Sequence, residues 1–396
     1  MQFFKPSFYA AFAFALTACA GSNPHFDASK PHHRPTGFVN NYLENSKIGE
    51  GFLRWQWARF NSSLPIDKPE RVPRQAADVA YLQANRTDTT ATWLGHATML
   101  WQIGGKNILV DPIFSQRASP VSFAGPPRLT PLPMSLSELP HIDAVVISHN
   151  HYDHLDRPTV LALQQQKGGA PLFIVPLGIS DWLKREGITT VQGLDWWQHS
   201  TLGGASSDGV KVSLVPAQHW SSRTLIDRQE SLWGGFVVQH QGYARYYSGD
   251  TGYSKDFADI AAKFGKFDFA QIPVGCYEPR WFMGNQHVNE PEAVQIHRDV
   301  GSKLSVGVHW GTFRLCDDPV DQVIDEFPKA VKAAGLNPSE FVLPALGQTF
   351  VLQRAAQVKP QAQAQAAASA LTASSTAASS SVSSSPVSSS PRNPPL

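Results

Sequence analysis

The sequence predicts an α/β protein in which two β-sheets are covered by helices. Three observations favour this fold class. Short apolar runs alternate with helical periodicity between residues 91 and 352, neighbouring strand patterns are followed by helical ones, and no internal repeat interrupts this order. We therefore expect the folded part to occupy the middle of the 396-residue chain.

Apolar runs bounded by glycine, proline or polar residues predict the strands. Gly104 and Gly105 separate two of these runs and predict a two-residue hairpin turn. Strands are expected at residues 92–94, 99–103, 107–110, 144–148, 172–175, 210–216, 235–240, 244–248, 269–273, 304–308 and 348–352. Helices are expected at residues 158–166, 181–186, 254–264, 290–300 and 320–334, two of them with proline at or near the first turn.

The overall charge argues against one class of partner. The chain has 33 Lys and Arg against 32 Asp and Glu, and its net charge is +1. Proteins that bind nucleic acid through bulk charge carry a clear positive excess. We therefore expect no nucleic-acid partner. The 14 histidines are the unusual feature of the composition, and their placement guides the functional interpretation below.

The first 18 residues predict a bacterial lipoprotein signal peptide. Lys5 precedes an apolar run over residues 8–18, which is too short for a bilayer that needs about 20 residues. The sequence Leu-Thr-Ala-Cys ending at Cys19 resembles a lipobox, and Ala20 stands where an inner-membrane retention signal has aspartate. We expect Cys19 to be lipidated and to anchor an outer-membrane lipoprotein of the cell envelope, with a periplasmic catalytic domain. An ordinary cleaved signal with an incidental cysteine is the alternative.

Composition also divides the rest of the chain. Residues 19–35 are expected to be a linker, residues 36–354 the folded domain, and residues 355–396 a disordered tail rich in Ser, Ala, Gln and Pro. Only Lys359 and Arg392 are charged in this tail, and it has no aromatic residue or periodicity that could bury a face. A short helix in its Gln/Ala-rich part is the alternative.

Four metal-binding side chains follow the strand expected at 144–148. They are His149, His151, Asp153 and His154, in the pattern H-x-H-x-D-H. Imidazole and carboxylate groups suit Zn²⁺, with Fe or Mn as substitutes, and no thiolate set points to a closed structural site. A solvated polar turn is the alternative interpretation of the pattern.

More ligands are expected at later strand ends, because one loop cannot fill two metal sites. His219, Asp250 and His309 each follow an apolar run and lie beside glycine or another small residue. A carboxylate such as Asp250 can bridge two cations and hold a shared hydroxide between them.

These motifs resemble the metallo-β-lactamase superfamily, and within it the family of phospholipases D that hydrolyse N-acylphosphatidylethanolamine. The resemblance extends from about residue 37 to residue 352. It rests on the strings TWLGHAT, DPIFSQRASP, SELPHIDAVVISHNHYDHLD, LDWW, PAQHW, SGDTGY, GCYEPRWFMGNQHV and HWGTF. It implies a four-layer αββα sandwich, a metallo-hydrolase domain over residues 36–354, and a binuclear metal site.

The resemblance also implies roles for individual residues. Two Zn²⁺ ions would be held by His149, His151 and His219 on one side and by Asp153, His154 and His309 on the other, with Asp250 bridging. Asp250 and Asp153 would be the catalytic carboxylates. Substrate contacts are expected from Gln286, His287, Tyr152, His96 and Trp220, although His96 could equally be a core histidine. The chain departs from the family pattern at Gln116, which replaces a serine, and at Cys276, which replaces an alanine.

The implied reaction is phosphodiester hydrolysis of a membrane phospholipid. A metal-bridging hydroxide oriented by Asp250 would attack phosphorus and release N-acylethanolamine and phosphatidic acid. Two alternatives stay open. One is a metal-dependent lactonase acting on acyl-homoserine or sugar lactones, and the other is a non-catalytic metal-binding lipoprotein of the envelope.

Two cysteines remain besides Cys19. Cys276 and Cys316 both follow strands that lead to the expected site. An oxidising periplasm permits a disulfide, but a bridge requires Cα atoms within about 7 Å. The sequence leaves this pairing open, and it does not predict the oligomeric state.

Overall fold

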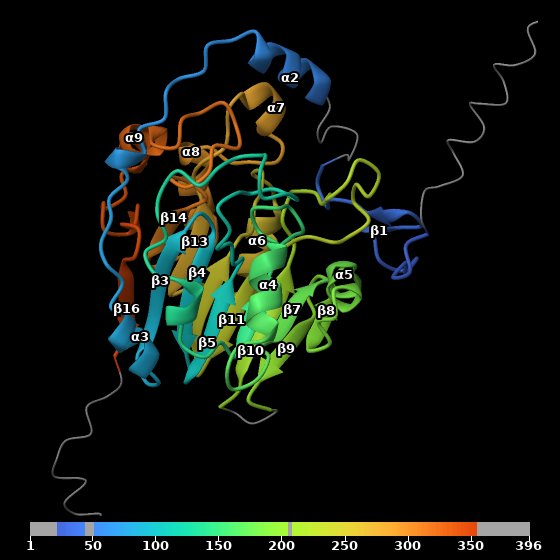
Figure 1. The fold of residues 1–396 in the computed structure, drawn as a ribbon, viewed down its shortest axis with the longest axis vertical. Helices are drawn as coiled ribbons and strands as arrows, with labels where there is room; N and C mark the ends of the chain where they lie inside the picture. The colour runs from blue at the N-terminus through green and yellow to red at the C-terminus, as the bar shows by residue number, and fades with distance from the viewer. Residues whose placement is uncertain (1–21, 44–50, 205–207, 355–396) are drawn as a thin grey trace, which may run out of the picture. The chain divides into compact units, whose positions relative to one another are not determined.

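The computed structural model describes residues 22–43, 51–204 and 208–354 (Figure 1). The predicted signal peptide, Cys19 and the tail at 355–396 lie outside these residues, as do residues 19–21 of the predicted linker.

Two seven-stranded sheets form the centre of the described structure. The strands of the first sheet, in spatial order, are β16 (Thr349–Gln353), β3 (Thr89–Gly95), β4 (Thr98–Ile103), β5 (Lys106–Val110), β6 (Ala144–Val146), β7 (Leu172–Pro176) and β8 (Val191–Leu194). The second sheet contains β15 (Phe341–Val342), β14 (Ser305–Val308), β13 (Phe269–Pro273), β12 (Tyr243–Tyr247), β11 (Gly235–His240), β10 (Val210–Val215) and β9 (His199–Leu202). Each sheet is antiparallel at one side and parallel at the other.

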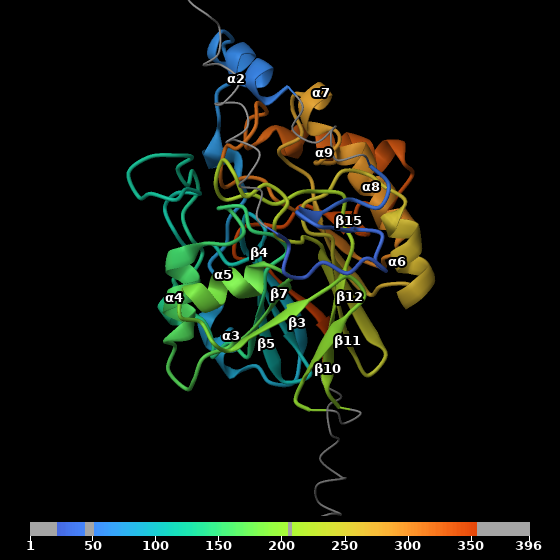
Figure 2. The ribbon, with the colours of Figure 1, turned by 90° about the vertical axis from the view of Figure 1, so that its right-hand side faces the viewer.

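Helices cover the outer faces of both sheets, which confirms the predicted four-layer αββα sandwich (Figure 2). The first sheet is covered by α3 (Val79–Ala84), α4 (Arg157–Gln164) and α5 (Ile179–Arg185), and the second by α6 (Asp256–Phe264), α8 (Glu290–Asp299) and α9 (Gln322–Ala333). The shorter elements are α2 (Phe52–Phe60), α7 (Arg280–Met283), the 3₁₀ turns Pro69–Arg71 and Leu136–Glu138, and the strand pair β1 (His33–Arg34) and β2 (Gly37–Phe38).

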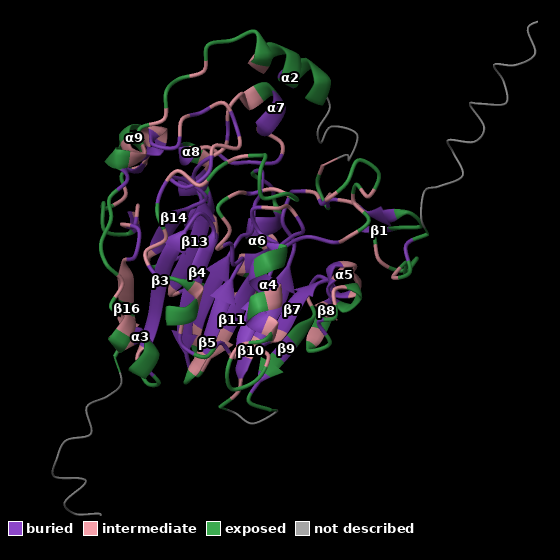
Figure 3. Cartoon of the chain, in the orientation of Figure 1, coloured by how far each residue is buried: buried purple, intermediate pink, exposed green. Residues whose placement is uncertain are grey.

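Strand β4 shows how the sequence pattern forms the layers. Met99, Trp101 and Ile103 point into the core between the sheets, whereas Leu100 packs into the cluster under α3, α4 and α5. Both faces of β4 are buried because both are covered, and Figure 3 shows the strands of the two sheets as mostly buried. Each fully buried side chain of this size contributes about 1.5–3 kcal/mol through the hydrophobic effect.

Several predicted elements are confirmed, including the hairpin at Gly104 and Gly105, where both glycines have positive φ. Strands β8, β9 and β15 and helices α2, α3 and α7 were not predicted from the sequence. Strands β8 and β9 contain glycine or polar residues and lie at sheet edges, and α7 has only four residues. Their formation depends on tertiary neighbours rather than on local periodicity.

The linker prediction is wrong for residues 22–35. Residues 22–43, called the N-terminal strap below, pack against the sandwich. Lys30 Nζ lies 2.5 Å from Asp195 Oδ2 and His32 Nε2 lies 2.7 Å from Asp195 Oδ1. The His32 ring also stacks on Trp196 at a centroid distance of 4.4 Å. The polar composition that suggested a linker instead supplies partners for one buried carboxylate.

Asp195 is the centre of this attachment. Burial alone would raise the pKa of Asp195, but hydrogen bonds from His32 and Lys30 hold it well below its ordinary value. The carboxylate is therefore charged at neutral pH and paired with both strap residues.

We expect Asp195→Ala to lower the free energy of unfolding by about 3 kcal/mol, because it leaves His32 buried without its partner. Asp181→Ala is the matched control, since Asp181 pairs with His25 of the same strap at a more exposed position, and it should cost no more than about 1 kcal/mol. Chemical denaturation of both variants checks this. Equal effects would contradict the central role of Asp195.

Candidate metal site

The candidate site lies where chain segments leave one end of both sheets. His96 follows β3, Asp111 follows β5, residues 149–154 follow β6, and His309 follows β14. His219 and Asp250 lie within a few residues of the ends of β10 and β12. Within each sheet the pairing directions bring these strand ends to the same edge. Contacts of Asp153 and Asp250 with His154 and His309 join the two edges. The fold therefore gathers residues that are more than 200 positions apart in the sequence.

Three histidines form one group of potential ligands. His151 Nδ1 lies 2.9 Å from His149 Nε2 and 3.3 Å from His219 Nε2. All three nitrogens belong to a set close enough to bind a single ion. His149 and His219 are buried and His151 is partly exposed, so this group faces the open side of the site.

The second group joins two carboxylates to two histidines. Asp153 Oδ2 lies 3.1 Å from His154 Nε2 and 3.2 Å from His309 Nε2. Asp250 Oδ2 lies 3.2 Å and 3.1 Å from the same two nitrogens, and 3.9 Å from His149 Nε2 of the first group. Asp250 thus faces both groups, which is the placement that a bridging carboxylate requires.

In the metal-free protein, the pKa values of the histidines differ between the two groups because the groups differ in their nearby charges. Burial lowers the pKa of His219 to about 3 and that of His151 to about 4, and with His154 it holds the pKa of His149 well below its ordinary value. Burial also lowers the pKa of His154 and His309, but the negative charges of Asp250 and Asp153 raise it by more. The pKa of His154 is raised well above its ordinary value and that of His309 to about 9.

The carboxylates respond in the opposite direction. Burial would raise the pKa of Asp153 and Asp250, but the neighbouring imidazoles His154 and His309 hold both well below their ordinary values. Both carboxylates are therefore ionised at neutral pH and available as ligands.

Asp111 orients this cluster, and the sequence analysis did not identify it as a site residue. Its Oδ2 accepts a hydrogen bond from His154 Nδ1 at 2.7 Å and another from Tyr247 Oη at 2.6 Å. Ser148 Oγ donates to the same carboxylate and lies 2.9 Å from His149 Nδ1. These contacts direct the opposite nitrogens of His154 and His149 into the site, as outer-shell groups do in metal sites.

The residues present fit divalent cations. Asp250 Oδ1 is buried and has no hydrogen-bond partner among the described residues. A buried polar atom without a partner is costly, and a cation coordinated by this oxygen would remove that cost. Nitrogen and carboxylate oxygen donors without thiolate suit Zn²⁺, Fe or Mn.

The predicted substrate residues occupy three different positions. His96 is buried, with Nε2 2.7 Å from Asp153 Oδ2, so it contacts a potential ligand rather than an open edge. His287 Nδ1 lies 3.9 Å from Asp250 Oδ2. Gln286 uses its backbone carbonyl to accept from His219 Nδ1 at 3.0 Å, while its side-chain Oε1 has no hydrogen-bond partner among the described residues.

Tyr152 and Trp220 lie on the more open side. The Trp220 ring packs edge-on against His151 at 4.5 Å. Tyr152 donates a hydrogen bond to the Arg223 carbonyl, and the Arg223 guanidinium lies 4.1 Å from its ring centroid. Tyr152 also lines a cleft of about 670 Å³ together with Gln116 and Trp182. This cleft adjoins the metal-site loop because Tyr152 lies between His151 and Asp153.

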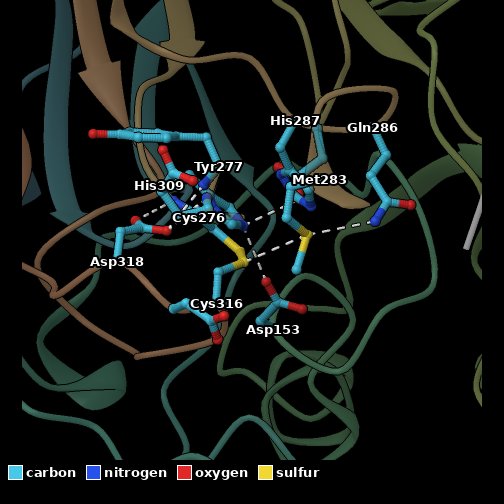
Figure 4. Close-up of a disulfide and its surroundings, with 12 residues drawn as sticks. Asp153, Cys276, Tyr277, Met283, Gln286, His287, His309, Cys316 and Asp318 are labelled. Atoms are coloured by element: carbon cyan, nitrogen blue, oxygen red, sulfur yellow. Dashed lines mark hydrogen bonds and ion pairs between the residues drawn. A yellow bond between two sulfur atoms is a disulfide. The ribbon is translucent and has the colours of Figure 1, made fainter. Parts of the chain in front are cut away.

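A disulfide closes the rim of the site, which answers the pairing question that the sequence left open. Cys276 and Cys316 are bonded, with Cα atoms 5.0 Å apart. Figure 4 shows the bridge beside His309, with Met283 between Cys316 and Gln286. The bridge joins the loop after β13 to the loop that carries His309. The family departure at Cys276 therefore has a covalent partner in this chain.

The fold and the site define a metal-dependent hydrolase of the metallo-β-lactamase superfamily. Residues 106–310 match the beta-lactamase superfamily domain, and the chain belongs to this superfamily. An isothiocyanate hydrolase from Delia radicum gut bacteria has the same fold, with a TM-score of 0.53 and 20% identity over 67% of this chain and 99% of that one.

Two relatives share higher sequence identity with this chain. N-acyl-phosphatidylethanolamine-hydrolyzing phospholipase D 1 of Caenorhabditis elegans is 43% identical over 231 residues, which are 57% of this chain and 64% of that protein. The match thus spans just under two thirds of that relative. An uncharacterized protein of Mycobacterium tuberculosis is 37% identical over 328 residues, covering 80% of this chain and 84% of that protein.

Metal loading should release protons at pH 7. The metal-free protein carries protons on His154 and His309, because the pKa of His154 is raised well above its ordinary value and that of His309 to about 9. These raised values stabilise the folded protein fully below about pH 6.5, and the contribution of His309 is lost as the pH rises through about 9. Cations displace these protons, so we expect about one to two protons released per chain at pH 7 and fewer at about pH 10. Calorimetric titration in buffers of different ionisation enthalpy measures the number. A count that does not fall between these pH values would contradict the assignment.

Reducing the disulfide should lower the free energy of unfolding by about 2–4 kcal/mol, because the bridge closes a loop of 40 residues. Urea unfolding with and without reductant measures this. The double variant Cys276→Ala/Cys316→Ala is the control and should not respond to reductant. An unchanged urea midpoint in the reduced wild-type protein would show that the bridge does not stabilise the fold.

Proposed function

We propose that this chain is a phospholipase D-type phosphodiesterase. Its substrates would be phospholipids of the N-acylphosphatidylethanolamine class, and its products N-acylethanolamine and phosphatidic acid. The observation that carries this proposal is the 43% identity over 231 residues to a protein named for that reaction. The buried cluster of five histidines and two aspartates supports it chemically.

Two Zn²⁺ ions are the proposed cofactors, with Fe or Mn as substitutes. When bound, such ions lower the pKa of water towards 7 and neutralise charge that develops on phosphate oxygens. His149, His151 and His219 would hold one ion, and Asp153, His154 and His309 the other. Asp250 would contribute to both, because its Oδ2 faces His149 as well as His154 and His309.

The protein's own groups would then position the reacting phosphodiester. Asp250 and Asp153 are ionised and fixed by imidazoles, so they can accept hydrogen bonds and orient a nucleophilic water without moving. His287 lies beside Asp250, and burial lowers its pKa to about 3. A neutral imidazole there can donate one hydrogen bond to a phosphate oxygen without adding positive charge.

The adjoining cleft offers a place for the glycerolipid part of the substrate. Trp182 and Ile226 supply apolar surface, and the guanidinium of Arg223 lies over Trp182 at 4.7 Å. A site that combines aromatic surface with cationic groups suits an amphiphile whose phosphate is negative. Gln116, where the family has serine, lines the same cleft.

The proposed location is the outer membrane, with the domain in the periplasm and Cys19 as the lipid anchor. Acyl chains on Cys19 would hold the protein to a membrane, since each buried CH₂ contributes about 0.8 kcal/mol. Among the described residues, no helix is long and apolar enough to cross a bilayer. A membrane-anchored hydrolase would meet its lipid substrate at the surface to which it is attached.

The direct test is hydrolysis of N-acylphosphatidylethanolamine vesicles by the zinc-loaded protein, with lactone opening measured in parallel. We expect N-acylethanolamine release, and a loss of about three orders of magnitude or more in Asp250→Asn and His149→Ala. His199→Ala changes an exposed histidine of β9 and should retain wild-type activity. Lactone turnover without phosphodiester hydrolysis would refute the proposed function. Full activity of Asp250→Asn would refute the site assignment.

A further inference from the structure

The N-terminal strap reaches a proposed metal ligand through one side chain. Asn40 Oδ1 accepts a hydrogen bond from the backbone N–H of His219 at 3.0 Å, and Asn40 Nδ2 donates to the His219 carbonyl, also at 3.0 Å. The two residues are 179 positions apart and both are buried. Asn40 therefore pairs with both backbone groups of this histidine.

His219 needs such a partner because it lies outside the regular sheet. The chain leaves β10 at Val215, and His219 itself belongs to no strand. Its buried backbone N–H and C=O have no partners in a strand ladder, and burial makes unpaired groups costly. A primary amide offers one acceptor and two donors from a single planar group, so asparagine can pair with both at once.

Asn40 is itself held on both flanks. Phe38 is buried in the core, and its N–H donates to the Gln229 carbonyl at 2.9 Å. On the other side, Asn41 Nδ2 donates to Asp256 Oδ1 of α6 at 2.7 Å. The Trp233 indole N–H lies 3.3 Å from Asn40 Oδ1. These contacts fix the orientation of the Asn40 side-chain amide independently of its hydrogen bonds to His219.

Two contacts together determine where the His219 ring points. Asn40 fixes the backbone, and the Gln286 carbonyl accepts from Nδ1. Nε2 is then left facing His151 Nδ1 at 3.3 Å. Without Asn40, the ring would keep its contact with Gln286, but the His219 backbone would lose the two hydrogen bonds that fix its position.

We propose that Asn40 is a positioning residue for the ion held by His149, His151 and His219, and that the strap is part of the metal site. This inference rests on the proposed role of His219 as a ligand. It predicts that a change at Asn40 weakens the binding of that ion more than the binding of the other, because Asn40 pairs with both backbone groups of His219.

The experiment is a titration of the metal-free full-length protein with Zn²⁺ against a competing chelator, which resolves two binding steps. Asn40→Ala should weaken one step about 10–100-fold, as outer-shell changes do, and leave the other within about twofold. Asn40→Asp keeps the acceptor for the His219 N–H but loses the donor to its carbonyl, so it should weaken the same step by less. Asn61→Ala is the matched control, because it removes an identical side chain from an exposed position just after α2, where Asn61 Nδ2 donates to the Trp57 carbonyl. It should bind both ions as the wild type does.

The variant His219→Ala tests the ligand role of His219 separately from the positioning role of Asn40. If His219→Ala weakens one step and both Asn40 variants leave it unchanged, the positioning role is refuted while the ligand assignment stands. If His219→Ala changes neither step, the ligand assignment itself is refuted. An equal weakening of both steps in Asn40→Ala, with a lower unfolding temperature of the metal-free protein, would show a general structural role and overturn the proposal. If Asn40→Ala does not fold, the same criteria apply to Asn40→Asp.

Discussion

The buried ionisable cluster at one end of the two sheets is the constraint on which the rest of the structure depends. The nitrogens of His154 and His309 lie 3.1–3.2 Å from the carboxylates of Asp153 and Asp250. The other group consists of His149, His151 and His219. Its nearest carboxylate is Asp250, which lies 3.9 Å from His149 Nε2. Three neighbouring imidazoles of which two are buried are stable only if they stay neutral, and neutral imidazoles with converging nitrogens are suited to bind a metal ion. Divalent cations would satisfy both halves of the cluster at once.

The surrounding fold keeps these side chains in place. Asp111 at the end of β5 holds His154, the Gln286 carbonyl holds His219, and the disulfide fixes the loop that carries His309. Each contact joins a proposed ligand to an element from a different part of the chain. The sandwich therefore acts as a rigid frame in which loop residues are fixed by their neighbours rather than by their own backbone preferences.

The sequence predicted what depends on local pattern. The hairpin at Gly104 and Gly105, the αββα layers and the superfamily are confirmed, because turn glycines, apolar runs and the H-x-H-x-D-H motif are each contained in a short stretch. Residues whose role depends on a distant partner were missed. Asp111 acts on a histidine 43 positions away.

The linker error has the same cause. Residues 22–35 are polar and rich in proline and histidine, which is typical of a linker. These residues are held in place by Asp195, which lies more than 160 positions later in the sequence. No local sequence pattern predicts that contact. The short edge strands β8 and β9 likewise form because their neighbours offer hydrogen bonds, so periodicity alone does not reveal them.

Metal content is the most direct test of the central claim that this cluster holds two cations. Elemental analysis of the purified full-length protein, after removal of loosely bound ions by gel filtration, counts the ions per chain and identifies them. The account predicts about two divalent ions per chain, most of them zinc, and their loss after dialysis against a strong chelator. A protein that binds one ion or none after zinc is offered at neutral pH would contradict it.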